Sequence, residues 1–395
     1  MLKRTRSFLV LVMLLMTVTM SAQVTTATMS GKVTAQDEPI IGATIVAIHE
    51  PSGTRYGTVT NVSGQFNLQG MRTGGPYKVE ISYVGYQTAI YKGINLLLGE
   101  NYVLNVSLKE SSELLDEVVV TASKESNMKS DRAGAIMNAN RDMISNTPTI
   151  SRSISDIMRL SPQGADVGNG FAVGGGNYRQ SFVTVDGAAF NNTFGLGGNL
   201  PANGSPISLD ALEQVTVAVT PFDVRQSGFT GGAINAVTRS GDNQFRGTAY
   251  MYFNNENLKG SKVDDYELLR SKAQYYTYGA SFGGPIIKDK LFFFVNGEYE
   301  DNVTAGSNYR PRTALGESYS GGNIHRPLQS DMDDMRGFLL NKYNFDPGKY
   351  NDYSTDTPAY RVMARVDWNA NQNNKVSFRF TKTHTKDSNF PTSSV

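Results

Sequence analysis

The sequence predicts a mainly β protein: a β-sandwich, then an α+β domain, then the first strands of a transmembrane β-barrel. The composition is typical of turns and aromatic strands, because 39 glycines, 20 tyrosines and 19 phenylalanines accompany one tryptophan. Short strands at even spacing fill the first third of the chain, as in a sandwich. Near the end, segments of about ten residues alternate apolar and polar side chains, as membrane strands do.

Length and charge limit the function classes. A chain of 395 residues is expected to form several domains. Lysine and arginine total 37 against 36 aspartates and glutamates, so the chain lacks the basic field that concentrates nucleic acid. Zero cysteines exclude disulfides, a cysteine-ligated metal and lipid attachment through cysteine. Nucleic acid is therefore not an expected partner.

Residues 1–22 have the pattern of an export signal. Basic residues precede the apolar run Phe8–Met16, and small residues follow at Ser21 and Ala22. The alternative, a membrane anchor, needs about 20 apolar residues, and this run is much shorter. The mature chain is therefore expected beyond the inner membrane.

Residues 23–110 are expected to form the sandwich. Glycine, proline and asparagine separate short runs of strand-forming residues. The expected strands are Met29–Val33, Ala43–Ile48, Tyr56–Thr60, Gln65–Leu68, Tyr77–Tyr83 and Tyr102–Leu108. The stretches Gly31–Val33, Pro39–Ala43, Thr60–Phe66 and Tyr83–Tyr86 resemble the carboxypeptidase regulatory-like domain. That resemblance implies a domain without catalytic activity.

The histidines do not form a catalytic pattern. A zinc peptidase needs three protein ligands, usually two histidines and a carboxylate, together with a general base. The three histidines here, His49, His325 and His384, lie far apart in the chain. No nucleophile elbow, phosphate loop or His-Glu-x-x-His pair is present. We therefore expect no enzyme activity, no cofactor and no metal.

Residues 111–124 form a linker with an unusual run of β-branched residues. Leu115–Ala122 reads LDEVVVTA, and consecutive valines favour an extended backbone that can add to the edge of a partner's sheet. Asp116 and Glu117 would protect such a strand from self-association. Composition alone favours another interpretation, in which the run is the last strand of the sandwich or a stiff connector.

The same string resembles the TonB box of transporters of the Bacteroidetes type. In those proteins the box follows a regulatory-like domain, as it does here. The resemblance implies that this coupling segment binds TonB, which transmits energy from its inner-membrane complex. The residues implied are Asp116, Glu117, Val118, Val119, Val120, Thr121 and Ala122.

Residues 125–241 mix helical and strand patterns. The expected elements are a helix over Ser151–Leu160, the strand Phe182–Val185, a turn at Asp186-Gly187, a short helix over Leu209–Glu213 and the strand Val215–Val219. Glycine clusters at 174–176 and 195–198 do not open a helix after a strand, so they are interpreted as loops rather than phosphate sites.

Three stretches of this region, Val183–Gly187, Leu212–Val217 and Gly228–Gly241, resemble the plug of TonB-dependent transporters. Phe190–Gly198 and Thr220–Gln226 resemble the Oar-like branch, as does Gly228–Gly241. Thr220–Phe222 replaces the Arg-Gly-Pro of many siderophore-type plugs, which weakens any inference that iron chelates are the cargo. The sequence therefore does not identify the substrate.

Residues 242–395 show the barrel pattern. In Tyr360–Trp368, Tyr360 and Val362 fall on one face and Arg361 and Arg365 on the other, which suits lipid on one side and water on the other. The other expected strands are Phe245–Phe253, Tyr275–Gly283, Leu291–Tyr299 and Val376–Thr381. Long connections alternate with short turns, as in outer-membrane barrels. Such a plugged barrel needs about 22 strands, so the sequence is interpreted as an N-terminal fragment.

The predicted function is TonB-dependent active transport of an unidentified substrate across the outer membrane. The sandwich and coupling segment would lie in the periplasm, and the expected partners are TonB, outer-membrane lipid and an extracellular substrate. The alternative is an outer-membrane receptor, adhesin or secretion-assisting protein without active import. A working docking strand distinguishes the two, because an adhesin has no use for one.

Overall fold

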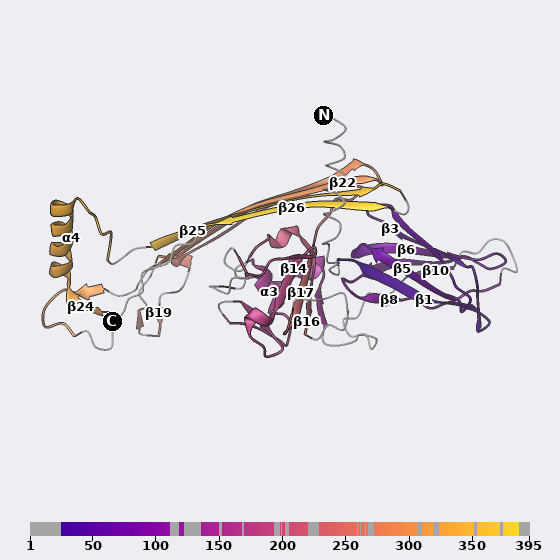
Figure 1. Cartoon of the computed structure of the whole chain (residues 1–395), viewed down its shortest axis with the longest axis horizontal. Helices are drawn as coiled ribbons and strands as arrows, with labels where there is room; N and C mark the ends of the chain where they lie inside the picture. Colours follow the sequence, from indigo (N-terminus) through magenta and orange to yellow (C-terminus); the bar gives the residue numbers. More distant parts are fainter. Residues whose placement is uncertain are drawn as a thin grey trace, which may run out of the picture. The chain divides into compact units, whose positions relative to one another are not determined.

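A computed structural model shows the architecture of the chain (Figure 1). It describes residues 25–110, 118–121, 136–149, 152–167, 170–192, 198, 200–201, 205–219, 229–258, 260, 262–264, 266–267, 272–305, 310–318, 324–350, 354–371 and 374–386. The predicted export signal, residues 1–22, lies outside this range, as do Asp116, Glu117, Ala122 and the Oar-like stretch Thr220–Gln226.

Two sheets form the sandwich. In the first, β1 (Ala27–Ala35) pairs with β2 (Glu38–Pro39) and β5 (Gln65–Met71) antiparallel and with β8 (Asn101–Val103) and β9 (Val106–Ser107) parallel. The second has the order β10-β7-β6-β3-β4 and consists of β3 (Thr44–His49), β4 (Thr54–Val59), β6 (Gly74–Ser82), β7 (Ala89–Leu96) and β10 (Val118–Thr121).

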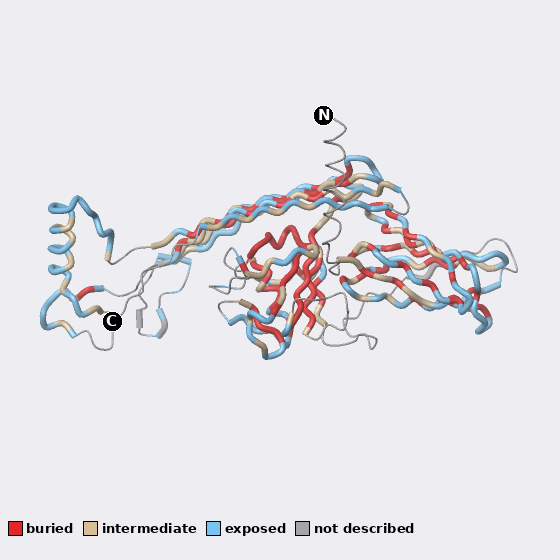
Figure 2. The backbone as a smooth tube through the Cα atoms, in the orientation of Figure 1, coloured by how far each residue is buried: buried red, intermediate tan, exposed pale blue. Residues whose placement is uncertain are grey.

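Alternation of side chains builds the core of the sandwich. In β3, Ile45 and Ala47 are fully buried and their neighbours are not, which is the period of two expected for a strand with one face inward (Figure 2). All members of the core cluster lie between Ala27 and Leu108. The sandwich therefore has a hydrophobic core of its own, and we expect it to fold by itself.

The plug region, residues 136–241, is a small α+β unit. Its main sheet has the order β11-β16-β17-β14-β15, with β11 (Ile136–Ala139), β14 (Phe182–Val185), β15 (Ala188–Ala189), β16 (Leu212–Ala218) and β17 (Ala233–Thr238). The hairpin β12 (Gly164–Asp166) and β13 (Phe171–Val173) and the helical elements α2 (Arg141–Asn146), α3 (Ile154–Met158), η2 (Tyr178–Gln180) and η3 (Leu209–Ala211) complete it. Asp186 occupies the predicted turn with a φ of 50°.

Long strands form the barrel sheet in the order β18-β21-β22-β25-β26. They are β18 (Arg246–Asn255), β21 (Gln274–Ile287), β22 (Leu291–Ala305), β25 (Ser354–Asn369) and β26 (Lys375–Thr385). Their connections contain η4 (Glu256–Leu258), β19 (Lys262–Val263), β20 (Tyr266–Glu267), β23 (Arg310–Arg312), β24 (Ile324–Leu328) and α4 (Gln329–Tyr343). Among the described helices, none has both the length and the apolar character to cross a bilayer.

The predicted alternation in β25 is confirmed. Tyr360 and Val362 are 51% and 48% exposed, whereas Arg361 and Met363 are 2% exposed. Apolar side chains therefore cover the outer face of this strand, and charged side chains are buried on the other, the reverse of a soluble sheet.

Several expected elements differ in extent. Tyr102–Leu108 is two short strands, β8 and β9, rather than one, and the helix expected over Ser151–Leu160 is confined to Ile154–Met158. β7 and α4 were not predicted. The described residues within 1–246, 282–295 and 363–380 form one compact unit, and those within 247–281, 296–362 and 381–395 form a second.

Candidate coupling segment and plug

The coupling segment lies on the sandwich. Val118, Val119, Val120 and Thr121 pair in parallel with Ala89, Ile90, Tyr91 and Lys92 of β7. The segment is thus extended, as predicted, and it extends the second sheet by one strand. This pairing agrees with the alternative that the run is the last strand of the sandwich. A strand held through its backbone is also suited to transfer to another sheet edge, so the pairing does not decide between the two.

The edge of β7 that does not pair with β6 is where the segment docks. β7 pairs with β6 on one side, and β10 occupies the other. Gln87, just before β7, donates its N–H to the carbonyl of Lys109 (2.9 Å), and Tyr86 forms an isolated bridge with Glu110. The sandwich chain therefore ends beside the start of β7, close to the position that Val118 takes.

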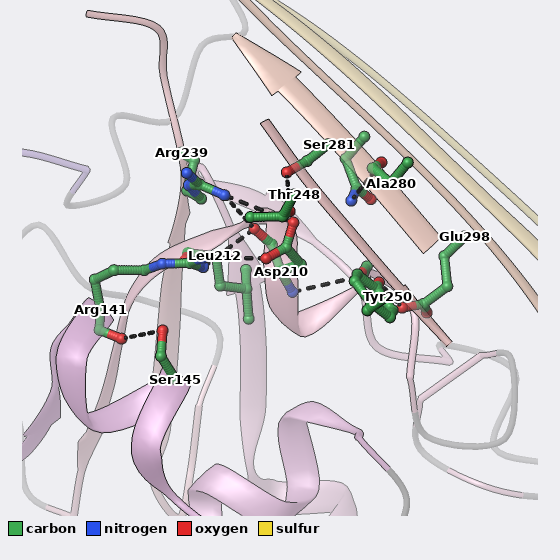
Figure 3. Close-up of polar contacts among 12 residues, drawn as sticks. Arg141, Ser145, Asp210, Leu212, Arg239, Thr248, Tyr250, Ala280, Ser281 and Glu298 are labelled. Atoms are coloured by element: carbon green, nitrogen blue, oxygen red, sulfur yellow. Dashed lines mark hydrogen bonds and ion pairs between the residues drawn. The ribbon is translucent and has the colours of Figure 1, made fainter. Parts of the chain in front are cut away.

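A charge cluster stabilises the interior of the plug region. Asp210 is 7% exposed, and its carboxylate lies 3.0 Å from Nη2 of Arg141 and 3.6 Å from Nη1 of Arg239 (Figure 3). Nη1 of Arg141 also donates to the carbonyls of Asp210 and Leu212, at 3.2 Å each. Arg141 begins α2 and Leu212 begins β16, so this cluster fastens the helix to the central strands.

Polar groups join the plug region to two barrel strands in the same compact unit. Asp186 accepts hydrogen bonds from the N–H of Thr238 (3.0 Å) and its hydroxyl (2.5 Å), and Arg379 of β26 lies 3.3 Å from the same carboxylate. Arg365 of β25, 6% exposed, donates to the carbonyl of Thr238 (2.5 Å). Asp367 pairs with Arg365 (2.8 Å) and accepts from the hydroxyl of Ser240.

Two apolar side chains of the barrel strands also pack on the plug region. Phe294 of β22 and Met363 of β25 belong to the core cluster of the plug region, and the other members come from the plug region itself. The guanidinium of Arg239 lies 4.8 Å from the ring centroid of Phe294. The described contact between plug region and barrel strands therefore combines these two apolar side chains with buried polar and charged groups.

One buried amide links the sandwich to the plug region. Gln214 of β16 is 2% exposed, donates to the carbonyl of Leu96 (3.1 Å) and accepts from the N–H of Leu98 (2.8 Å). These bonds have the pattern of a pair of sheet hydrogen bonds. A plug residue therefore satisfies the backbone carbonyl of Leu96, the last residue of β7, and the backbone N–H of Leu98. Sequence reasoning missed this residue, because its partners lie more than a hundred positions away.

The second compact unit contains a buried ion-pair cluster. Arg361 lies 3.0 Å from Glu298 and 2.7 Å from Glu300. Tyr250 donates a hydrogen bond to Glu298 (Figure 3). Thr248 and Ser281 form a hydroxyl pair at 2.6 Å. The carboxylates of Glu298 and Glu300 balance the positive charge of Arg361, which the sequence predicts on the polar face of β25.

His49, the histidine of the sandwich, is buried among hydroxyl groups and an aromatic ring. His49 Nδ1 lies 2.7 Å from the Ser52 hydroxyl, and its ring packs on Tyr77 at 5.0 Å. Burial, with help from the positive charge of Arg72, lowers the pKa of His49 to about 3. Within the described parts of the chain, no group of three or more His, Asp or Glu residues could hold a metal ion.

Comparison with known families gives two matches. Residues 28–109 match the carboxypeptidase regulatory-like domain, and residues 237–395 match an outer membrane beta barrel domain. The TonB-dependent transporter Oar of Myxococcus xanthus is 27% identical over 242 residues, which are 60% of this chain and 21% of Oar. The TonB-dependent receptor SusC of Bacteroides thetaiotaomicron is 29% identical over 269 residues, 64% of this chain and 24% of SusC. The chain is thus similar to TonB-dependent outer-membrane receptors and carries a carboxypeptidase regulatory-like domain and an outer membrane beta barrel domain.

The resemblance stated from the sequence is thereby confirmed, as are the fold class and the outer-membrane location. The chain spans about a fifth to a quarter of the length of these two relatives, which are 21% and 24% covered. Solved structures with similarity include the siderophore receptor PirA from Acinetobacter baumannii (16% identity, TM-score 0.43, 64% of this chain and 31% of PirA). The ferric enterobactin receptor PfeA from Pseudomonas aeruginosa, a double mutant, gives 14% identity and a TM-score of 0.44 over 65% of this chain and 33% of PfeA. The relatives are transporters and receptors rather than enzymes.

Proposed function

We propose that this receptor imports its substrate actively, and that TonB binds the coupling segment Asp116–Ala122. The observation that carries the proposal is the place of this segment. It joins the sandwich, whose described chain ends at Glu110, to the plug region, whose first strand begins at Ile136. A pull on the segment would therefore reach the plug region directly along the chain.

The polar contacts of the plug region support its movement. Breaking the bonds from Arg365 to Thr238 and from Arg379 to Asp186 exposes groups that water solvates. A hydrogen bond to a charged group contributes about 1.5 to 3 kcal/mol net, because water replaces the lost partner in part. Displacement into a hydrated lumen would thus cost less than the separation of an apolar interface of the same size.

The substrate is not part of the proposal. The relatives are TonB-dependent, but this chain covers only a minor part of each, and the described loops concentrate no recognition chemistry in one place. The partners proposed are TonB with its inner-membrane complex, outer-membrane lipid around the barrel strands and an extracellular substrate. A receptor or adhesin without active import is the alternative outcome of the test.

The test measures binding of the periplasmic domain of TonB to a peptide of residues 111–124. We expect saturable binding, and we expect Val119→Pro to abolish it, because proline removes a backbone donor and breaks strand pairing. An established TonB-box peptide is the positive control. If neither peptide binds while the control does, the outer-membrane receptor without active import becomes the better account.

A further inference from the structure

The edge of β7 is the feature that carries a further inference, which rests on the proposed function. If Asp116–Ala122 is the segment that TonB binds, then in this structure part of that segment is already paired. Val118–Thr121 use their backbone to extend the sheet of the sandwich. A strand that is paired on one edge cannot present the same hydrogen-bonding groups to a second sheet.

We propose that β7 is a resting site for the coupling segment and competes with TonB for it. The sandwich would then control how much of the segment is available, and TonB would bind the fraction that has left β7. The occupant is a named part of this chain, and the register from Val118 with Ala89 to Thr121 with Lys92 defines the contact.

The described residues on either side of the linker favour the resting position. Tyr86, just before β7, bridges Glu110, and Ala89, the first residue of β7, pairs with Val118. Glu110 and Val118, the described residues nearest to each other across this part of the chain, thus have partners only three positions apart, at Tyr86 and Ala89. A short tether of this kind gives an effective concentration on the order of millimolar, which a dilute partner in the periplasm has to overcome.

The pairing is also short enough to be reversible. It comprises four residues, fewer than the usual strand length of about five to six, and only one edge of β10 is paired with a described strand. β10 is the terminal strand of the sheet order, so removing it leaves β7, β6, β3 and β4 paired as before. Release would then not require the sandwich to unfold.

A disulfide tests the competition directly, because the chain has no native cysteine. Lys92 is exposed and is the register partner of Thr121, and directly paired residues lie within the distance that a disulfide bridges. The variant Lys92→Cys/Thr121→Cys should cross-link within one chain on mild oxidation. The matched control is Val59→Cys/Thr121→Cys, since exposed Val59 lies on β4 at the opposite edge of the same sheet.

The readout is binding of the TonB periplasmic domain to the detergent-solubilised protein. We expect the oxidised Lys92/Thr121 variant to lose binding and to regain it on reduction, whereas the Val59/Thr121 control should neither cross-link nor change. We also expect the unmodified protein to bind about tenfold more weakly than the free peptide of residues 111–124. Equal binding by protein and peptide, or unchanged binding after oxidation, would overturn the resting site.

A second variant avoids any change in the strands. Inserting about twenty Gly/Ser residues between Ser111 and Ser112 lowers the effective concentration of the segment at β7, and TonB affinity should rise several-fold. An unchanged affinity contradicts the inference. Failure of the free peptide to bind TonB would instead contradict the proposed function, so the two failures are distinguishable.

Discussion

Asp186 of the plug region and Arg379 of strand β26 form an ion pair, with Oδ2 of the aspartate 3.3 Å from Nε of the arginine. The two residues are 193 positions apart in the chain. Arg379 also donates to the backbone carbonyl of Asp186 at 3.3 Å, and Asp186 accepts two hydrogen bonds from Thr238. One carboxylate thus connects the turn after β14, the end of β17 and a barrel strand.

Asp186→Asn is expected to loosen this connection. The side chain of Arg379 is 27% exposed, so solvent screens the lost ion pair in part, and we expect a destabilisation of about 1 to 2 kcal/mol. Amide hydrogen exchange in β14 and β17 should accelerate accordingly. Asp142→Asn, on the exposed first turn of α2, is the matched control and should leave exchange unchanged. Equal effects of the two variants would refute the connection.

Asp210→Asn should affect the plug region more strongly. The substitution leaves Arg141 and Arg239 near a neutral amide in a buried site, and loss of one partner of a buried cluster costs about 3 kcal/mol. Hydrogen exchange in β16 would report the loss. The surface pair of Arg159 with Asp166 provides the comparison, and Asp166→Asn should cost about 0.5 kcal/mol or less. A smaller effect at Asp210 than at Asp166 would contradict the burial argument.

The stability of the sandwich should fall at low pH because of His49. In the unfolded chain His49 takes up a proton near pH 6.5, whereas in the folded chain its pKa is lowered to about 3. The unfolded state therefore binds more protons between these values, and stability decreases as the pH falls through this window. From pH 7.5 to 5 the loss from this group is about 2 kcal/mol.

Urea unfolding of residues 23–110 at both pH values measures the effect. His49→Asn should be less stable at pH 7.5 but should show less dependence on pH. A His49 pKa above 6, measured by NMR titration of the folded sandwich, would show the prediction to be wrong.

Gly31 should not tolerate a side chain. A Cβ at this position would lie 1.8 Å from the carbonyl oxygen of Leu104, which is backbone and cannot move aside alone. We expect Gly31→Ala to destabilise the sandwich by about 3 kcal/mol. Gly57→Ala is the control, because its Cβ would meet only the carbonyl of Ile45 at 3.9 Å. Thermal unfolding that ranks the two variants in the opposite order would contradict the packing.

Local patterns in the sequence account for the strands that were predicted. Phe182–Val185 agrees with β14 residue for residue, and the alternation around Tyr360 agrees with β25. The turn Asp186-Gly187 marks the end of the first segment, and in the second an apolar face alternates with a face that carries Arg361 and Arg365. β7 was missed because Lys92 and Gly93 interrupt its apolar pattern, and Gly93 has a φ of 78°. α4 was missed because none of its residues is buried, so it carries no apolar stripe.

The partners in the candidate site depend on the fold and not on local sequence. The sequence predicted that Val118–Val120 would be extended, and this is confirmed, but nothing in it pointed to β7 as the edge that the segment occupies. Gln214 likewise acquires its role from partners more than a hundred positions away, and Asp186 from Thr238 and Arg379, which are 52 and 193 positions away. The assignment of Asp116–Ala122 to TonB stays a prediction.

Photo-cross-linking in living cells tests that assignment most directly. A genetically encoded benzophenone amino acid at position 119 of the intact protein should yield a light-dependent adduct with TonB. The same amino acid at position 62, a 76% exposed site in a turn of the sandwich, should yield none. An adduct from position 119 alone is the predicted result. No adduct from position 119, or equal adducts from both positions, would contradict coupling through this segment.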